Sequence, residues 1–220
     1  MDQVWEELHS TRDWGKYPAE DLIRRVMRHV RAREDREKTS VLELGCGAGA
    51  NLSFFIAEGF QVTGIDGAPS AIGNAKTRLA PMLSKGQTLD LEVCYFENID
   101  FPQASFDLIV DYLAIYANRL DLIQTVYSKA KRLLKPEGRF YTRVWGSACD
   151  GAGTGHIIEP GTSENPTSGP CKDMGVSHFF SLEELQDLFS DWSDVEITRF
   201  TTEADDKSTF WEEFVVWAKP

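Results

Sequence analysis

Three glycines at alternate positions follow a short apolar segment, and their spacing is the first feature of the chain that could do chemistry. The segment at residues 40–44 runs directly into Gly45-Cys-Gly47-Ala-Gly49. Glycines at such a turn let the backbone bend sharply and approach a ligand without a Cβ clash. A glycine-rich loop after a strand is typical of nucleotide-binding sites, but the GxGxG spacing differs from the dinucleotide pattern GxGxxG. The glycine spacing alone therefore leaves the ligand open.

Asp66 ends the next apolar segment, residues 61–66. An acid at the end of a second strand can accept hydrogen bonds from both hydroxyls of a ribose. The alternative is that Asp66 only caps the following helix, expected over residues 70–79. The glycines upstream of Asp66 favour the ribose-binding role.

Several side chains that could exchange a proton lie later in the chain. His178 and His156 are the candidates for a catalytic base, with Tyr116 as a third choice, because imidazole and phenol groups can act in proton transfer. Each also has a structural alternative. His178 borders the aromatic pair Phe179-Phe180, His156 lies in a polar loop, and a tyrosine after a strand is commonly a packing residue.

Substrate contacts are expected from residues near the mouth of the predicted site: Trp14, Tyr17, Tyr112, Arg143 and Trp145. Arg143 alternates with apolar residues along its strand. It is either an outward-facing charge or a clamp for a carboxylate or phosphate. Trp14 and Tyr17 flank Gly15, where they either cover the site or pack against the core.

Strands alternate with helices along most of the chain. The apolar patterns predict strands at 40–44, 61–66, 91–95, 106–111 and 139–145, and helices at 50–58, 70–79 and 120–134. A first helix is expected after Pro18, a turn at 135–138, a capped helix from Ser181 through Phe189, and two final strands at about 194–201 and 209–218. This alternation predicts an α/β fold with a doubly wound, mostly parallel sheet, which binds ligands at the carboxyl ends of its strands.

Two segments depart from this alternation. Residues 1–36 are expected to form a helical N-terminal segment that covers the substrate, ahead of a main domain over 37–220. Residues 146–177 are rich in glycine and proline and contain few large apolar side chains. A stretch of this length is too long for an ordinary connection, so we expect a functional lid, a substrate loop or partial disorder.

Four motifs together resemble the class I S-adenosylmethionine-dependent methyltransferases. They are Val41-Leu-Glu-Leu-Gly-Cys-Gly-Ala-Gly, Val62-Thr-Gly-Ile-Asp66, Ser105-Phe-Asp-Leu-Ile-Val110 and Leu133-Leu-Lys-Pro-Glu-Gly-Arg-Phe140. The resemblance covers about residues 38–145. It implies a Rossmann-like methyltransferase fold with a seven-stranded sheet whose final strand is antiparallel, and S-adenosyl-L-methionine as the cofactor.

The resemblance also implies roles for individual residues. Glu43 would reach the methionine amine of the cofactor, and Asp66 its ribose hydroxyls, with Gly67 beside the adenine. The methionine and ribose portions would be lined by Gly45, Cys46, Gly47 and Gly49. Asp111 would help to hold the cofactor amino group. The acid that commonly follows the third strand is replaced by Tyr95, so the adenine contact is expected from Phe96, Glu97 or Asn98.

The methyl acceptor is expected to be a small molecule methylated on oxygen or nitrogen. The segment Asp111-Tyr-Leu-Ala-Ile-Tyr116 lacks the Pro-Pro-aromatic pattern of nucleic-acid amino methyltransferases, and no Asp-Asn pair suggests a metal-dependent enzyme. Two alternatives stay open. One is a catalytically inactive partner subunit that binds the cofactor, and the other, disfavoured by GxGxG, is an NAD-dependent dehydrogenase.

Composition agrees with an acidic globular protein. The chain has 220 residues and a formal net charge of −12, which argues against a nucleic-acid partner. No apolar run is long enough for a membrane span or a signal peptide, so we expect no membrane partner and a cytoplasmic location. The four cysteines form no CxxC pair and are expected to be reduced thiols, with no metal site. The oligomeric state is left open.

Overall fold

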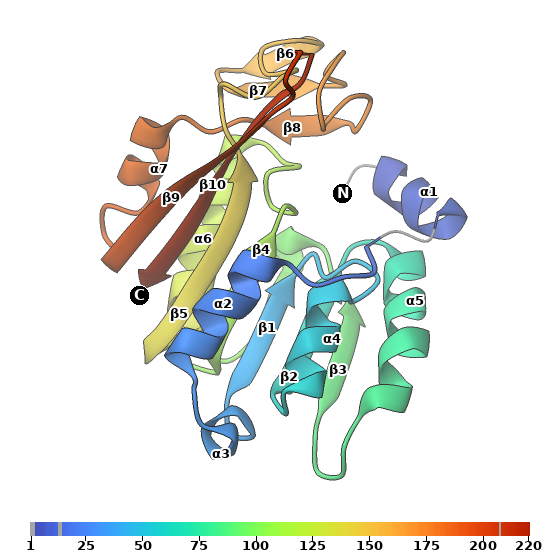
Figure 1. Ribbon diagram of the computed structural model, residues 1–220, viewed down its shortest axis with the longest axis vertical. Coiled ribbons are helices and arrows are strands. Elements are labelled where there is room, and N and C mark those ends of the chain that lie inside the picture. The colour runs from blue at the N-terminus through green and yellow to red at the C-terminus, as the bar shows by residue number, and fades with distance from the viewer. Residues whose placement is uncertain (1–2, 13–14, 207) are drawn as a thin grey trace.

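A mostly parallel sheet organises the chain (Figure 1). The computed structural model describes residues 3–12, 15–206 and 208–220, and its seven-stranded sheet has the order β3-β2-β1-β4-β5-β10-β9. These strands are β1 Ser40–Leu44, β2 Gln61–Asp66, β3 Leu89–Val93, β4 Phe106–Tyr112, β5 Leu134–Trp145, β9 Ser193–Glu203 and β10 Phe210–Lys219. Only β10 runs antiparallel to its neighbours within this sheet. The predicted fold class and the antiparallel final strand are therefore confirmed.

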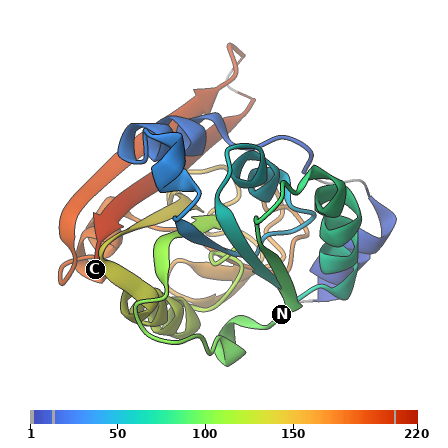
Figure 2. The same ribbon diagram turned by 90° about the horizontal axis from the view of Figure 1, so that it is seen from below.

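Helices cover both faces of the sheet (Figure 2). One face carries α2 Glu20–His29, α4 Ala50–Ala57 and α5 Pro69–Leu79, and the other carries α6 Leu120–Leu133 and α7 Leu182–Leu188. Successive strand residues point to opposite faces. Val41 accordingly packs with the α2 and α4 side, and Leu42 with the α6 side. Burial on both faces explains why most residues of the central strands are apolar.

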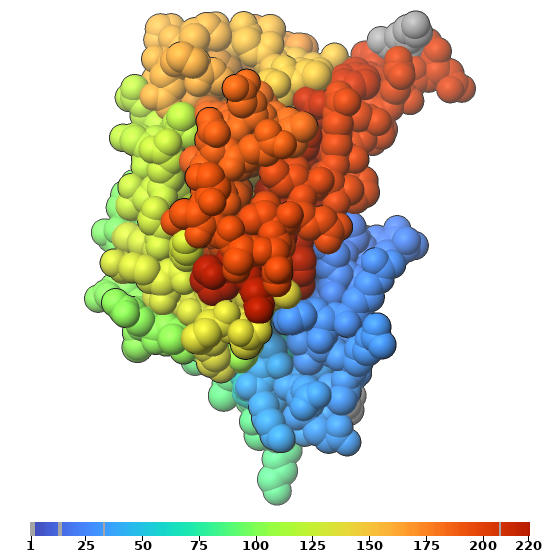
Figure 3. Space-filling model, turned by 90° about the vertical axis from the view of Figure 1, so that its left-hand side faces the viewer, coloured from blue at the N-terminus to red at the C-terminus, as the bar shows by residue number. Residues whose placement is uncertain are grey.

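The glycine-rich segment after β5 is folded rather than disordered. It contains an antiparallel sheet of β6 His156–Glu159, β7 Thr162–Glu164 and β8 Val176–His178. Cys149 and Cys171 are buried within it and join the main apolar cluster. In Figure 3 this segment, coloured orange, caps one end of the molecule above β9 and β10. Partial disorder was therefore the wrong expectation for this insertion.

The structure differs from the sequence predictions at three places. A helix α1, Gln3–Thr11, precedes the predicted first helix, and a short α3, Arg33–Arg36, follows it. The segment 135–138, expected as a turn, belongs to β5. There the pairing shifts from Phe106 with Leu134 to Leu108 with Arg139, so the extra residues bulge out of the ladder. Single 3₁₀ turns, η1 Ala80–Met82 and η2 Phe96–Asn98, flank β3.

The predicted start of α7 at Ser181 is confirmed. The Ser181 side chain accepts a hydrogen bond of 3.0 Å from the backbone N–H of Glu184, which is the N-cap half of the predicted capping box, whereas the Glu184 carboxylate contacts His178 Nε2. Among the helices of the described ranges, none is long and apolar enough to cross a membrane.

Candidate functional site

The main cavity lies at the carboxyl ends of β1, β2 and β4, where the fold predicts ligand binding. Gly45 and Gly49 adopt the left-handed backbone region with φ of 68° and 81°. A Cβ on Gly45 would come within 2.3 Å of the Ala114 Cβ, and one on Gly49 within 2.6 Å of Leu79. Gly45 thus lets the loop after β4 approach the floor of the cavity, whereas Gly49 serves helix packing behind it.

Asp66 holds the backbone on both of its sides. Its Oδ2 accepts from the Gly47 N–H at 2.9 Å, and its Oδ1 accepts from the Ala68 N–H at 2.8 Å. Burial raises the pKa of Asp66, and the two backbone hydrogen bonds oppose that rise. The carboxylate still lines the cavity, so the capping role and a ligand-binding role are compatible in one side chain.

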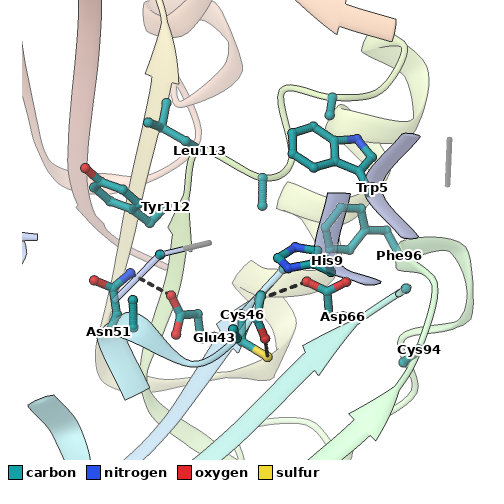
Figure 4. A pocket seen from close by; sticks show the side chains of 18 of the residues that line it. Trp5, His9, Glu43, Cys46, Asn51, Asp66, Cys94, Phe96, Tyr112 and Leu113 are labelled. Atoms are coloured by element: carbon teal, nitrogen blue, oxygen red, sulfur yellow. Dashed lines mark hydrogen bonds between the residues drawn. The ribbon is translucent and has the colours of Figure 1, made fainter. Parts of the chain in front are cut away.

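Glu43 presents an unpaired carboxylate oxygen in the same cavity (Figure 4). Its Oε1 accepts a 2.7 Å hydrogen bond from Asn51 Nδ2, while its Oε2 is buried and has no hydrogen-bond partner among the described residues. Burial raises the pKa of Glu43 to about 8, opposed by the Asn51 hydrogen bond. Asn51 is itself fixed, because its Oδ1 accepts from the Ala19 N–H at the start of α2. The arrangement can bind a cationic group.

The segment after β3 forms another wall of the cavity. Cys94, Tyr95, Phe96 and Glu97 line it. The Phe96 ring reaches within 3.5 Å of where a Gly45 Cβ would be. Of the residues predicted for the adenine contact, Phe96 and Glu97 line the cavity with Gly67, whereas Asn98 does not.

Asp111 and Gly49 do not line the cavity, contrary to their predicted contact with the cofactor. Asp111 is fully buried. Its Oδ1 accepts from the N–H groups of Ala114 and Ile115, and its Oδ2 accepts from the Thr142 hydroxyl. Burial raises the pKa of Asp111 to about 6. Asp111 therefore shapes the loop that follows β4, and its side chain does not face this cavity.

None of the three residues predicted as bases lines the cavity. The His178 ring is completely buried, 2.6 Å from Thr162 Oγ1 at Nδ1 and 3.0 Å from Glu184 Oε2 at Nε2. His156 is exposed on β6, and Tyr116 is buried edge-on against Trp145. His178 thus joins the insertion to α7, and Tyr116, whose carbonyl accepts from the His178 N–H, packs against the end of β5. These contacts correspond to the structural alternatives.

Some of the residues predicted to contact the substrate line the cavity, and others do not. Tyr17 and Tyr112 line the cavity, although Tyr17 is 86% exposed. Trp145 is buried outside the cavity, between Tyr116 and Trp211. Trp14 lies outside the described residues.

Arg143 is neither an outward-facing charge nor a clamp for a ligand's carboxylate or phosphate, the two roles expected for it. Its Nε and Nη2 donate to the two carboxylate oxygens of Glu213 at 2.8 and 2.6 Å, and its Nη1 donates to Asp21 at 2.8 Å. Its guanidinium also lies over the rings of Tyr112 and Phe200. These contacts occupy the guanidinium with α2 and β10, so Arg143 joins elements of the fold and is absent from the cavity lining.

Two residues of α1 belong to the site and were missing from the sequence prediction. Trp5 and His9 line the cavity from α1. The helix is fixed to α5, since the Glu6 carboxylate accepts from the Ser70 N–H at 3.1 Å and Asn74 Nδ2 donates to the His9 carbonyl at 3.0 Å. The apolar spacing of Val4, Trp5 and Leu8 is the signal that could have revealed this helix.

The described part of the chain contains no cluster of three or more His, Cys, Asp or Glu side chains able to hold a metal ion. The cavity instead offers the carboxylates of Glu43, Asp66 and Glu97, backbone groups of the glycine loop and aromatic walls. A loop of this kind at the ends of parallel strands suits a nucleoside-like ligand that carries a cationic group.

Comparison with known proteins gives the same indication. A family model described as a methyltransferase domain matches residues 35–164. An uncharacterised methyltransferase of Synechocystis is 32% identical over 100 residues, which are 46% of this chain and 44% of that protein. The match thus spans less than half of the curated relative.

Solved structures share the fold. An S-adenosylmethionine-dependent methyltransferase of Methanosarcina mazei has a TM-score of 0.66 at 21% identity, covering 82% of this chain and 92% of that chain. The Burkholderia thailandensis 1,6-didemethyltoxoflavin-N1-methyltransferase, with bound 1,6-didemethyltoxoflavin and S-adenosylhomocysteine, has a TM-score of 0.59 at 19% identity. That alignment covers 89% of this chain and 81% of the other. At these identities the likeness concerns the fold.

Proposed function

Because the chain belongs to the methyltransferase domain family, we propose that it transfers a methyl group from S-adenosylmethionine to an oxygen or nitrogen of a small molecule. The observation that carries the proposal is the unpaired Oε2 of Glu43, buried in a cavity that Asp66 also lines. A buried carboxyl oxygen without a partner costs free energy, whereas a cationic donor bound beside it would supply a hydrogen bond and favour the ionised carboxylate. The methionine ammonium of the cofactor is such a donor.

The cavity fits each part of the cofactor. Glu43 would bind the ammonium, and Asp66 retains lone pairs for the ribose hydroxyls beyond its two backbone hydrogen bonds. The backbone at Gly45 and Gly47 would lie against the methionine and ribose portions. Phe96 and Glu97 would flank the adenine.

Bound S-adenosylmethionine supplies a methyl group that is already activated by its sulfonium. The protein's part is therefore to position the acceptor and to exclude water. Tyr112, Leu113, Ala117 and Asn118 form the wall of the cavity that follows β4. Leu113 has a φ of 51°, a conformation that is uncommon for leucine, and its N–H donates to the Arg143 carbonyl. This loop is thereby held in one shape beside Gly45.

A small-molecule acceptor agrees with the charge of the site. Among the described residues that line the cavity there is no lysine or arginine, and Arg143 is engaged by Asp21 and Glu213. A nucleic-acid acceptor would require basic groups for its phosphates. The bound small molecule named for the Burkholderia structure supports the same class of acceptor.

The test combines binding and turnover. We expect calorimetry to show S-adenosylhomocysteine binding, and labelled S-adenosylmethionine to transfer its methyl group to components of a metabolite pool. The same pool with Glu43→Gln protein is the matched control, and it should give little transfer. Absence of both binding and transfer would overturn the proposal. Tight binding without transfer to any acceptor would instead support the inactive partner subunit.

A further inference from the structure

His9 has hydrogen-bonding capacity that the folded chain does not use. Its side chain is only 6% exposed, and its Nδ1 is buried without a hydrogen-bond partner among the residues that the structure describes. The ring nevertheless lines the main cavity. Buried polar atoms in folded proteins are almost always paired, so the unpaired ring nitrogen of a residue that lines a cavity calls for a partner that the chain does not supply, such as a ligand or a water molecule.

The ring faces the predicted ribose site. Its Cε1 lies 3.3 Å, and its Nε2 3.7 Å, from where a Cβ on Gly47 would be. Gly47 in turn donates its N–H to Asp66. In Figure 4 the His9 ring projects close to the Asp66 carboxylate, and the two side chains are near enough for the Asp66 charge to raise the pKa of His9 against the effect of burial. A group bound by Asp66 would therefore also meet His9.

The two side chains have complementary chemistry toward a hydroxyl. A carboxylate can only accept hydrogen bonds, so a hydroxyl on Asp66 must donate its proton there. The hydroxyl oxygen then still accepts a hydrogen bond. A neutral imidazole carries one N–H donor, and burial lowers the pKa of His9 by more than the nearby carboxylates of Asp66 and Glu6 raise it. The ring is thus suited to donate that second hydrogen bond.

We infer that His9 is a cofactor-binding residue, donating a ring N–H to the ribose hydroxyl oxygen whose proton is directed to Asp66. The inference rests on the proposed function, because it presumes that S-adenosylmethionine occupies this cavity. It also makes α1 a structural part of the cofactor site. The contacts of Glu6 with Ser70 and of Asn74 with the His9 carbonyl hold that helix on α5.

The experiment measures binding rather than turnover. Calorimetry compares S-adenosylhomocysteine with its 2′-deoxy and 3′-deoxy analogues on the wild type, His9→Phe and His9→Gln proteins. Phenylalanine keeps an aromatic ring without a donor, and glutamine restores a donor. Ser10→Ala, an exposed position on the same helix, is the control.

We expect His9→Phe to weaken S-adenosylhomocysteine binding about tenfold, or about 1.4 kcal/mol. One deoxy analogue should bind the wild type and His9→Phe equally, because it lacks the hydroxyl that His9 contacts. His9→Gln should recover part of the loss, and Ser10→Ala should bind as the wild type does. Hydrogen exchange should show α1 becoming more protected on binding in the wild type than in His9→Phe.

Three results would overturn the inference. Equal losses for the parent ligand and both analogues would mean that His9 acts only by packing. Unchanged or tighter binding by His9→Phe would mean that the ring merely fills space beside Gly47. Failure of the wild type to bind S-adenosylhomocysteine would overturn the proposed function as well, whereas the first two results would leave it intact.

Discussion

Asn51 Nδ2 lies 2.7 Å from Glu43 Oε1, and this hydrogen bond leaves the other carboxylate oxygen of Glu43 buried and unpaired within the described structure. Asn51 lies in the first turn of α4, just after the glycine loop, and Glu43 lies just before that loop. The hydrogen bond between them therefore joins the two ends of the loop. Burial raises the pKa of Glu43 to about 8, and the free protein therefore holds this carboxyl mostly protonated at neutral pH. Binding of an ammonium group would favour the ionised form.

Cofactor binding should consequently release a proton from Glu43. At pH 7 we expect S-adenosylhomocysteine binding to release about 0.9 proton, since a group with a pKa near 8 is about nine-tenths protonated there. Affinity should rise up to about tenfold per pH unit below pH 8 and level off above it. Calorimetry in buffers of different ionisation enthalpy measures the release, and Glu43→Gln should abolish it. Equal proton release by that variant would assign the proton to another group.

Asp66→Asn should weaken S-adenosylhomocysteine binding roughly 10- to 100-fold, because hydrogen bonds to a charged acceptor contribute about 1.5–3 kcal/mol. Asp107→Asn is a matched control. Asp107 also accepts from a backbone N–H, that of Ser40 at 2.9 Å, and lies at the opposite end of the sheet. Binding titrations and thermal melts of both variants separate a loss of ligand binding from a loss of stability caused by the weakened backbone hydrogen bond. If both variants lost affinity equally, Asp66 would be only a backbone cap.

Gly45→Ala should destabilise the protein by roughly 1–3 kcal/mol and abolish tight cofactor binding. The alanine would have to adopt a left-handed backbone conformation, and its Cβ would collide with the Cβ of Ala114. Gly73→Ala provides the control within α5, where an added Cβ meets nothing within 4 Å. That helical substitution should stabilise the protein by roughly 0.5–1 kcal/mol. Denaturant melts of the two variants measure the difference, and a neutral Gly45→Ala would contradict the close approach.

His178→Ala should lower stability by roughly 1–3 kcal/mol and leave kcat/KM unchanged in the protein that remains folded. The substitution removes both ring contacts, with Thr162 and with Glu184, from a buried site. His156→Ala, on the exposed β6 position, should change neither quantity. Thermal melts paired with labelled methyl transfer distinguish a structural role of His178 from a catalytic one. Lost turnover at unchanged stability would restore His178 as a catalytic residue.

Local sequence was sufficient to predict the roles of residues whose partners are close to them along the chain. Glu43 lies in β1, the glycine loop follows β1, and Asp66 ends β2. The apolar patterns of these strands are clear, and the parallel arrangement brings their carboxyl ends to one edge. The capping box at Ser181 depends on one helical turn and was predicted for the same reason. Residues that act through chain neighbours are readable from spacing because the geometry of one turn or one strand is nearly fixed.

Tertiary structure decided the roles of residues whose partners lie far along the chain. Arg143 was a plausible anion clamp until the fold placed Glu213 and Asp21 against it, and His178 a plausible base until Glu184 and Thr162 paired with it. His9 entered the site only because α1 packs on α5 across more than sixty residues of sequence. The sequence by itself determined the family, the sheet and the cofactor loop. The fold alone determined which charges neutralise one another in the interior and which stay available in the cavity, because burial and pairing are properties of contacts between distant segments.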